Sequence, residues 1–119
     1  MKIRFESLRV AESELDVMLV SDTRQNHFTK KERETISEIK DKIYKVIEGK
    51  KVIDVKSFFA ECDINIDKDE AEFLVHLYKR ACKEDLCKGT MVEGFTEQQR
   101  GIMFSFVYPI AREYGLKLE

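Results

Sequence analysis

Residues 29–48 read TKKERETISEIKDKIYKVIE, the strongest helix signal in this chain. Thr29 and Glu32 have the spacing of a capping box, in which each side chain accepts a hydrogen bond from the other residue's backbone N–H group. Four aliphatic residues follow at intervals of three and four, as on one face of a helix: Ile36, Ile39, Ile43 and Val46. We therefore expect a helix from Thr29 to about Glu48, ended by Gly49 in the left-handed conformation.

Two further helix starts have the same form, at Asp67-x-x-Glu70 and Thr96-x-x-Gln99. The first predicts a helix that runs to about Lys83 and has a broad apolar face. The second predicts a last helix that is apolar on nearly every side. Either other helices enclose this last helix, or it leaves apolar surface for a partner.

Pro109 lies within the last predicted helix. Because it has no N–H group and frees the carbonyl of Ser105, we expect a kink or a break there. Such a bend either fits the helix around the core or exposes large side chains to a partner, namely Phe104, Tyr108 or Ile110. Gly115 then ends the helix, with Leu116 available for the apolar contact that accompanies a left-handed stop.

The first 27 residues fit two interpretations. Ile3 and Phe5, and then the stretch 15–19, alternate with polar residues, which favours two short strands. A helical stripe also fits this region, through Leu8, Ala11, Leu15 and Met18. Further along, Asp54 can begin a short helix through Cys62, and residues 63–66 are expected to turn into the next helix.

The expected fold is mainly α, a compact bundle of about four helices with a small N-terminal strand pair or an additional helix, so that α+β remains open. We expect a single domain over residues 1–119, because a chain of this length buries one core. Residues 1–27 form its N-terminal segment and loop, and residues 28–119 form the helical core.

Composition excludes few functions. Charged residues make up 37% of the chain, but the net charge is only −2, so no overall charge points to nucleic acid or to a membrane surface. No signal-like apolar run follows Met1, and no apolar stretch approaches the roughly 20 residues of a membrane span. Three cysteines without paired spacing fit a reducing compartment. We therefore expect a cytoplasmic protein with no membrane contact.

Metal ligands and catalytic motifs are weak. The stretch 63–74 begins like a calcium loop, but Lys68 replaces the required glycine and Leu74 replaces the final glutamate. His76, Cys82 and Cys87 lack zinc-finger spacing, and the chain has no glycine-rich phosphate loop or nucleophile motif. We expect no metal, no cofactor and no assignable catalytic residue.

Residues 58–64 followed by a helix have the rhythm of a helix-turn-helix. The second helix would present carboxylates to the phosphates of DNA, so nucleic-acid binding is disfavoured. Residues 54–72 carry seven carboxylates against two lysines, which favours a basic partner or simply a solvated surface.

By elimination, the sequence favours a small non-catalytic module that binds another protein or a second copy of itself. Its candidate contacts come from three places, the acidic segment, the last helix and the isoleucine stripe: Asp63, Asp67, Asp69, Glu70, Glu72, Phe104, Tyr108, Ile36 and Ile43. A nucleic-acid-associated regulator is the first alternative. An enzyme whose site is dispersed over distant segments is the second.

Overall fold

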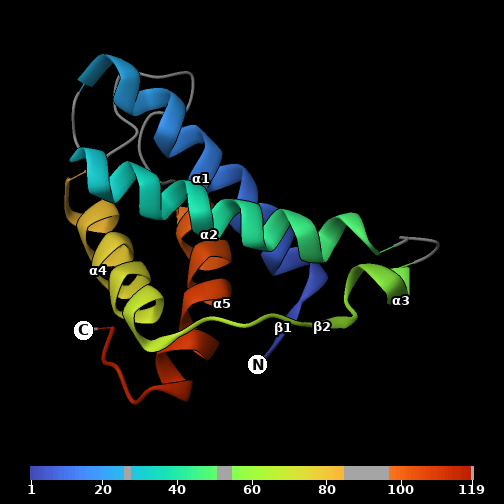
Figure 1. Cartoon of the computed structure of the whole chain (residues 1–119). Helices are drawn as coiled ribbons and strands as arrows, with labels where there is room; N and C mark the ends of the chain where they lie inside the picture. Colours follow the sequence, from blue (N-terminus) through green and yellow to red (C-terminus); the bar gives the residue numbers. More distant parts are fainter. Residues whose placement is uncertain (26–27, 51–54, 85–96, 119) are drawn as a thin grey trace.

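The computed structural model describes residues 1–25, 28–50, 55–84 and 97–118. Within these ranges the elements are, in order, β1 (Lys2–Arg4), α1 (Phe5–Gln25), α2 (Lys30–Glu48), α3 (Val55–Phe58), β2 (Glu61–Asp63), α4 (Lys68–Glu84) and α5 (Glu97–Glu113). The long helices α1, α2, α4 and α5 gather beside a short two-stranded sheet (Figure 1). The prediction of a mainly α bundle with a small strand pair is confirmed.

Capping boxes begin α2 and α4, as the sequence predicts. Thr29 donates its backbone N–H to Glu32 Oε1 at 2.9 Å, and the Glu32 N–H donates to Thr29 Oγ1 at 3.1 Å. The same reciprocal pair joins Asp67 and Glu70, at 3.0 and 2.8 Å. Each box satisfies backbone donors that the first turn of a helix leaves unpaired. The third predicted cap, Thr96, lies outside the described residues.

The N-terminal segment corrects one expectation. Residues 5–25 form a single helix, so the second strand expected at residues 15–19 is wrong. Burial follows the helical spacing, because the stripe of Leu8, Ala11, Leu15 and Met18 is fully buried. An apolar pattern over only a few residues fits the period of a strand and that of a helix. Packing against α2 and α5 selects the helix here.

β1 pairs with a strand about 60 residues away in the chain. It is antiparallel to β2, with Ile3 opposite Cys62 in the register. Both of these side chains face the core, while Lys2 and Asp63 meet on the exposed face at 3.7 Å between Nζ and Oδ2. The sheet therefore buries one face and places opposite charges across the other.

Residues 61–66 correct another expectation. From the sequence we expected a short helix that runs through Cys62 and a turn at residues 63–66, but these residues are extended. Their burial alternates through Cys62, Ile64 and Ile66, so a chain with strand periodicity leads directly into α4. A helix-turn-helix needs a tight turn between its two helices. Because β2 lies between α3 and α4, that geometry is not formed.

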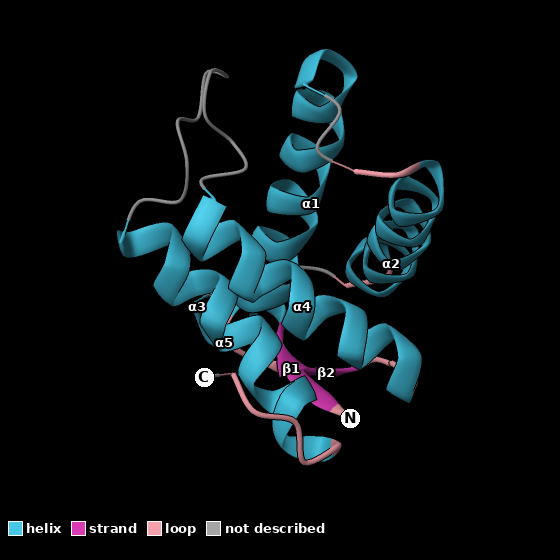
Figure 2. Cartoon of the chain, turned by 90° about the vertical axis from the view of Figure 1, so that its left-hand side faces the viewer, coloured by secondary structure: helices cyan, strands magenta, loops and turns pink. Residues whose placement is uncertain are grey.

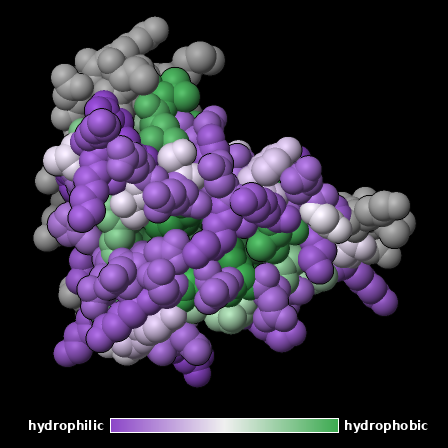
Figure 3. Space-filling view, viewed as in Figure 1, coloured by the Kyte–Doolittle hydropathy of each residue, from purple (hydrophilic) through white to green (hydrophobic). Residues whose placement is uncertain are grey.

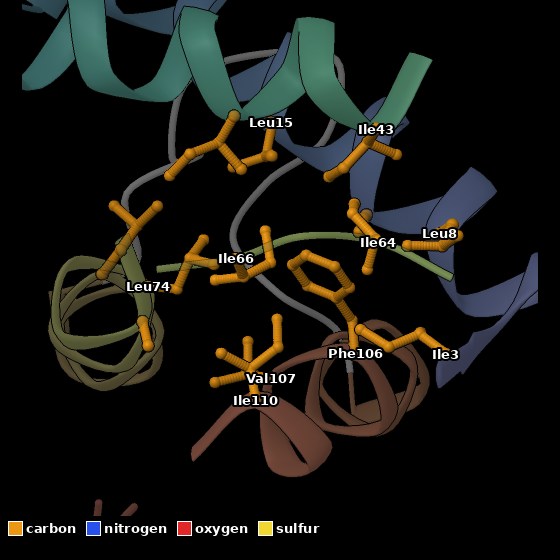
Figure 4. Packing of buried hydrophobic residues seen from close by; sticks show 14 of the residues in the cluster. Ile3, Leu8, Leu15, Ile43, Ile64, Ile66, Leu74, Phe106, Val107 and Ile110 are labelled. Atoms are coloured by element: carbon orange, nitrogen blue, oxygen red, sulfur yellow. The ribbon is translucent and has the colours of Figure 1, made fainter. Parts of the chain in front are cut away.

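The core lies where the helices face this extended segment. α1 packs against α2 and α5, and α5 also packs against α4 (Figure 2). Figure 4 shows Phe106 and Ile66 near the middle, with Leu15 and Ile43 approaching from α1 and α2. Apolar side chains from all four long helices are thus removed from water together, which is the main stabilising contribution.

Two glycines end helices in different ways. Gly49 has φ −78° and ψ −2°, so the expected left-handed stop is wrong there. The N–H of Lys50 instead reaches the Ile47 carbonyl at 3.1 Å, a tight final turn that needs no left-handed residue. Gly115 does adopt φ +64°, and the prediction for this helix end is confirmed.

Candidate docking groove

α5 has two different apolar faces in its described second half. Its inner face is buried through Phe106, Val107, Ile110 and Ala111, so Ile110 is not exposed as one expectation had it. Its outer face carries Phe104 and Tyr108, which remain 41% and 46% exposed. Pro109 lies inside the helix, which continues to Glu113 without a break. Because the rings of Phe104 and Tyr108 are partly exposed, this helix leaves aromatic surface uncovered.

Three aromatic rings form a cluster across α4 and α5. The rings of Phe104 and Tyr108 are stacked, with centroids 5.1 Å apart and planes at 27°. Tyr78 of α4 lies beside them, its ring centroid 6.3 Å from that of Phe104. The spacing of four residues puts Phe104 and Tyr108 on one helix face, and the packing of α4 on α5 brings Tyr78 to them.

The chain after α5 forms the second wall. The Leu116 N–H donates to the Ala111 carbonyl at 2.8 Å and the Gly115 N–H to the Arg112 carbonyl at 3.2 Å, the pair of bonds of a Schellman motif. This motif turns the chain back toward α4 (Figure 1). The Tyr114 hydroxyl donates to the Ile66 carbonyl and so ties this turn to the extended core segment.

Between these walls lies a hollow of about 650 Å³, which we call the docking groove. It is lined by Tyr78, Phe104, Tyr108, Ala111, Arg112, Gly115, Leu116, Lys117 and Leu118. Its size is typical of ligand pockets, and its lining is mainly apolar. The charged residues in the described part of the lining are both cations, Arg112 and Lys117.

A second hollow, of about 540 Å³, borders the same aromatic pair. Its lining is more polar and includes Lys2, Arg4, Ser7 and Ser105. The Ser7 and Ser105 hydroxyl oxygens lie 3.0 Å apart there, which joins α1 to α5. Phe104 and Tyr108 therefore line both hollows.

The predicted acidic residues do not gather around the docking groove. Asp67 and Glu70 form the capping box of α4, and Glu70 also accepts a hydrogen bond from Lys42. Asp63 pairs with Lys2 on the exposed face of the sheet, while Asp69 and Glu72 are exposed on α4. The face shown in Figure 3 is largely hydrophilic, with smaller apolar areas between the helices.

The isoleucine stripe is part of the core. Ile36 and Ile43 are 0% exposed, so their side chains are covered by this chain itself. Among the described residues, no group of three or more His, Cys, Asp or Glu side chains is placed to hold a metal ion. The side chains of Cys82 and Cys87 lie outside the described part of the chain.

Of the residues proposed from the sequence, only Phe104 and Tyr108 line the docking groove. Arg112 was not identified as a site residue from the sequence. Arg112 follows Tyr108 by four residues, as Tyr108 follows Phe104, so it could have been placed on the same helix face. Tyr78, Lys117 and Leu118 were missed as well. Their contribution depends on the packing of α4 and on the turn at Gly115, which no local spacing indicates.

No helix in the described part of the chain is both long enough and apolar enough to cross a lipid bilayer. Comparisons of the chain with protein-family models, with curated proteins and with solved structures find no match. The functional argument therefore depends on the groove itself.

Proposed function

We propose that this protein is a binding module that holds an apolar segment of another protein in the docking groove. The observation that carries the proposal is the aromatic cluster, in which Phe104 and Tyr108 stay 41% and 46% exposed beside a hollow. Covering such surface contributes about 25 cal/mol per Å² of apolar area. Aromatic side chains in the buried centre of an interface are also frequent hot spots.

The chemistry of the lining supports binding more than catalysis. Among the described residues that line the groove, none has a carboxylate, imidazole, thiol or serine hydroxyl side chain. General acid–base catalysis and nucleophilic catalysis most often use such groups in contacting pairs; of the described lining residues, only the two tyrosines and Lys117 belong to types that can also serve in this way. The groove instead offers aromatic rings, leucine side chains and two cations, a set that suits recognition of a peptide.

A peptide-display selection tests this function. Immobilised wild-type protein is used to select binders from a random library, and the double variant Phe104→Ala, Tyr108→Ala is used to remove binders that do not need these two rings. We expect selected peptides to lose affinity by about tenfold or more on Tyr108→Ala alone, as for hot-spot residues.

Tyr44→Ala is the matched control, because Tyr44 is 51% exposed on α2 and lies outside the groove lining. Its affinity for the same peptides should stay within about twofold of wild type, as is usual for residues outside an interface centre. Melting curves of each variant establish that it is folded. Failure to recover any peptide that depends on Phe104 or Tyr108 would overturn the proposal.

A further inference from the structure

We infer that the docking groove selects a segment that carries carboxylates beside its apolar anchor residues. This inference depends on the proposed function and adds the chemistry of the partner. Among the described residues that line the groove, Arg112 and Lys117 are the only charged ones, and both are exposed. An apolar partner with Asp or Glu at its flanks would cover the rings and neutralise both cations.

The two cations come from different segments of the lining. Arg112 belongs to the last turn of α5, one helical turn beyond Tyr108, and Lys117 belongs to the returning chain after Gly115. Within the described residues, neither of them forms an ion pair with a carboxylate. An interface that excludes water around these charges favours a partner that brings the opposite charge.

The two cations recognise carboxylates differently. An arginine guanidinium can bind both oxygens of one carboxylate in a planar, bidentate arrangement, whereas a lysine ammonium acts as a point charge. We therefore assign Arg112 the greater share of the selection. A replacement by lysine keeps the charge but loses the bidentate geometry, so it should weaken binding less than glutamine does.

The acidic helix start of a second copy is a poor occupant. Its carboxylates, at Asp67, Asp69 and Glu72, alternate with apolar residues that the core already covers, because Ala71 and Leu74 are 0% and 1% exposed. That helix could present carboxylates but no free apolar anchor. We therefore propose a segment of a different protein, and the oligomeric state tests the alternative in which exposed Phe59, two residues before Glu61, enters the groove of a second copy.

Two matched peptides test the inference. Each has about 14 residues, roughly four helical turns, with leucine at positions i, i+3, i+4 and i+7. One peptide has glutamate at its remaining flanking positions and the other has lysine, and both carry the same fluorophore for anisotropy. We expect the glutamate peptide to bind wild-type protein about tenfold more tightly, and this preference to shrink between about 50 and about 500 mM salt.

Charge reversal provides the decisive comparison. In the double variant Arg112→Glu, Lys117→Glu the preference should invert in favour of the lysine peptide, while Tyr44→Ala should keep the wild-type preference. Arg112→Gln, Lys117→Gln serves if the reversed variant does not fold, and it should abolish the preference. Sedimentation of the protein alone at micromolar concentration should give a monomer; a dimer disrupted by Tyr108→Ala would assign the groove to a second copy.

The two proposals fail in different ways. Equal binding of both peptides, or tighter binding of the lysine peptide, with loss of affinity on Tyr108→Ala, would overturn the acidic partner and leave the binding function intact. Absence of any Tyr108-dependent binding, by these peptides and by the selected library alike, would overturn the binding function itself.

Discussion

Lys42 on α2 donates a hydrogen bond from Nζ to Oε1 of Glu70 on α4, at 2.6 Å. The same Oε1 atom accepts the backbone N–H of Asp67 at 3.0 Å, so one carboxylate oxygen both caps α4 and ties it to α2. The Glu70 side chain is only 15% exposed, which limits screening of the pair by water and salt. A local capping motif therefore also holds two helices together.

We predict that Lys42 and Glu70 are energetically coupled. Removing either partner by Lys42→Ala or Glu70→Ala should lower the free energy of unfolding, by about 1 kcal/mol for Lys42 and by about 1–2 kcal/mol for Glu70, which also loses its cap. Urea unfolding of the two single variants and the double variant gives the coupling energy, expected at about 0.5–1 kcal/mol. Strictly additive effects would contradict the link between α2 and α4.

The cap at Thr29 predicts a second stability effect. Thr29→Ala removes the acceptor that the Glu32 N–H uses at 3.1 Å and should lower the free energy of unfolding by about 1 kcal/mol. Thr35→Ala is the control, because the Thr35 hydroxyl donates to the Lys31 carbonyl within the same helix. Alanine has the higher helix propensity, so this control should be neutral or slightly stabilising. Equal losses in both variants would argue against the capping role.

The third prediction concerns Tyr114→Phe, which removes one hydrogen bond between the chain that follows α5 and the core. This substitution removes the hydroxyl that donates to the Ile66 carbonyl, which should cost about 1 kcal/mol of unfolding free energy. Because this bond positions the turn that carries Leu116 and Lys117, peptide affinity for the docking groove should fall as well. Chemical denaturation measures the first effect and fluorescence anisotropy the second. Loss of stability with unchanged affinity would mean that the groove does not depend on this anchor.

We predict that the ion pair between Lys40 and Asp16 makes the free energy of unfolding depend on pH at alkaline values. The hydrogen bond from Lys40 to Asp16 raises the pKa of the Lys40 ammonium above its usual 10.5, against a smaller opposing effect of burial. Because the pKa of Lys40 is higher in the folded than in the unfolded state, its charge stabilises the fold fully at pH values below the unfolded-state pKa. This contribution to the unfolding free energy is lost as the pH rises through the folded-state pKa.

The test compares wild type with Lys40→Met in urea titrations from about pH 8 to about pH 12. The difference in unfolding free energy should be constant below about pH 9.5, since lysine is then fully charged in both states, and should shrink above 10.5. A difference that stays constant over the whole range would show that the Lys40–Asp16 bond contributes nothing.

Local sequence was sufficient where the partners are close in the chain. The capping boxes at Thr29 and Asp67 join residues three positions apart, so their hydrogen bonds form in the first turn whatever surrounds the helix. The left-handed end at Gly115 is local in the same sense. The buried stripe of α2 also follows from spacing alone, although spacing does not say what covers it.

Tertiary structure decided what depends on distant segments. β1 finds its partner in β2, so the choice of helix for residues 5–25 and strand for residues 61–63 could not be made from local alternation. The burial of Ile43 and the exposure of Tyr108 were equally open, since both residues lie on apolar helix stripes. The docking groove exists because α4 brings Tyr78 to α5 and the Gly115 turn returns Lys117 to its rim. Each of these contacts joins parts of the chain whose proximity is set by packing of the common core and not by any local propensity.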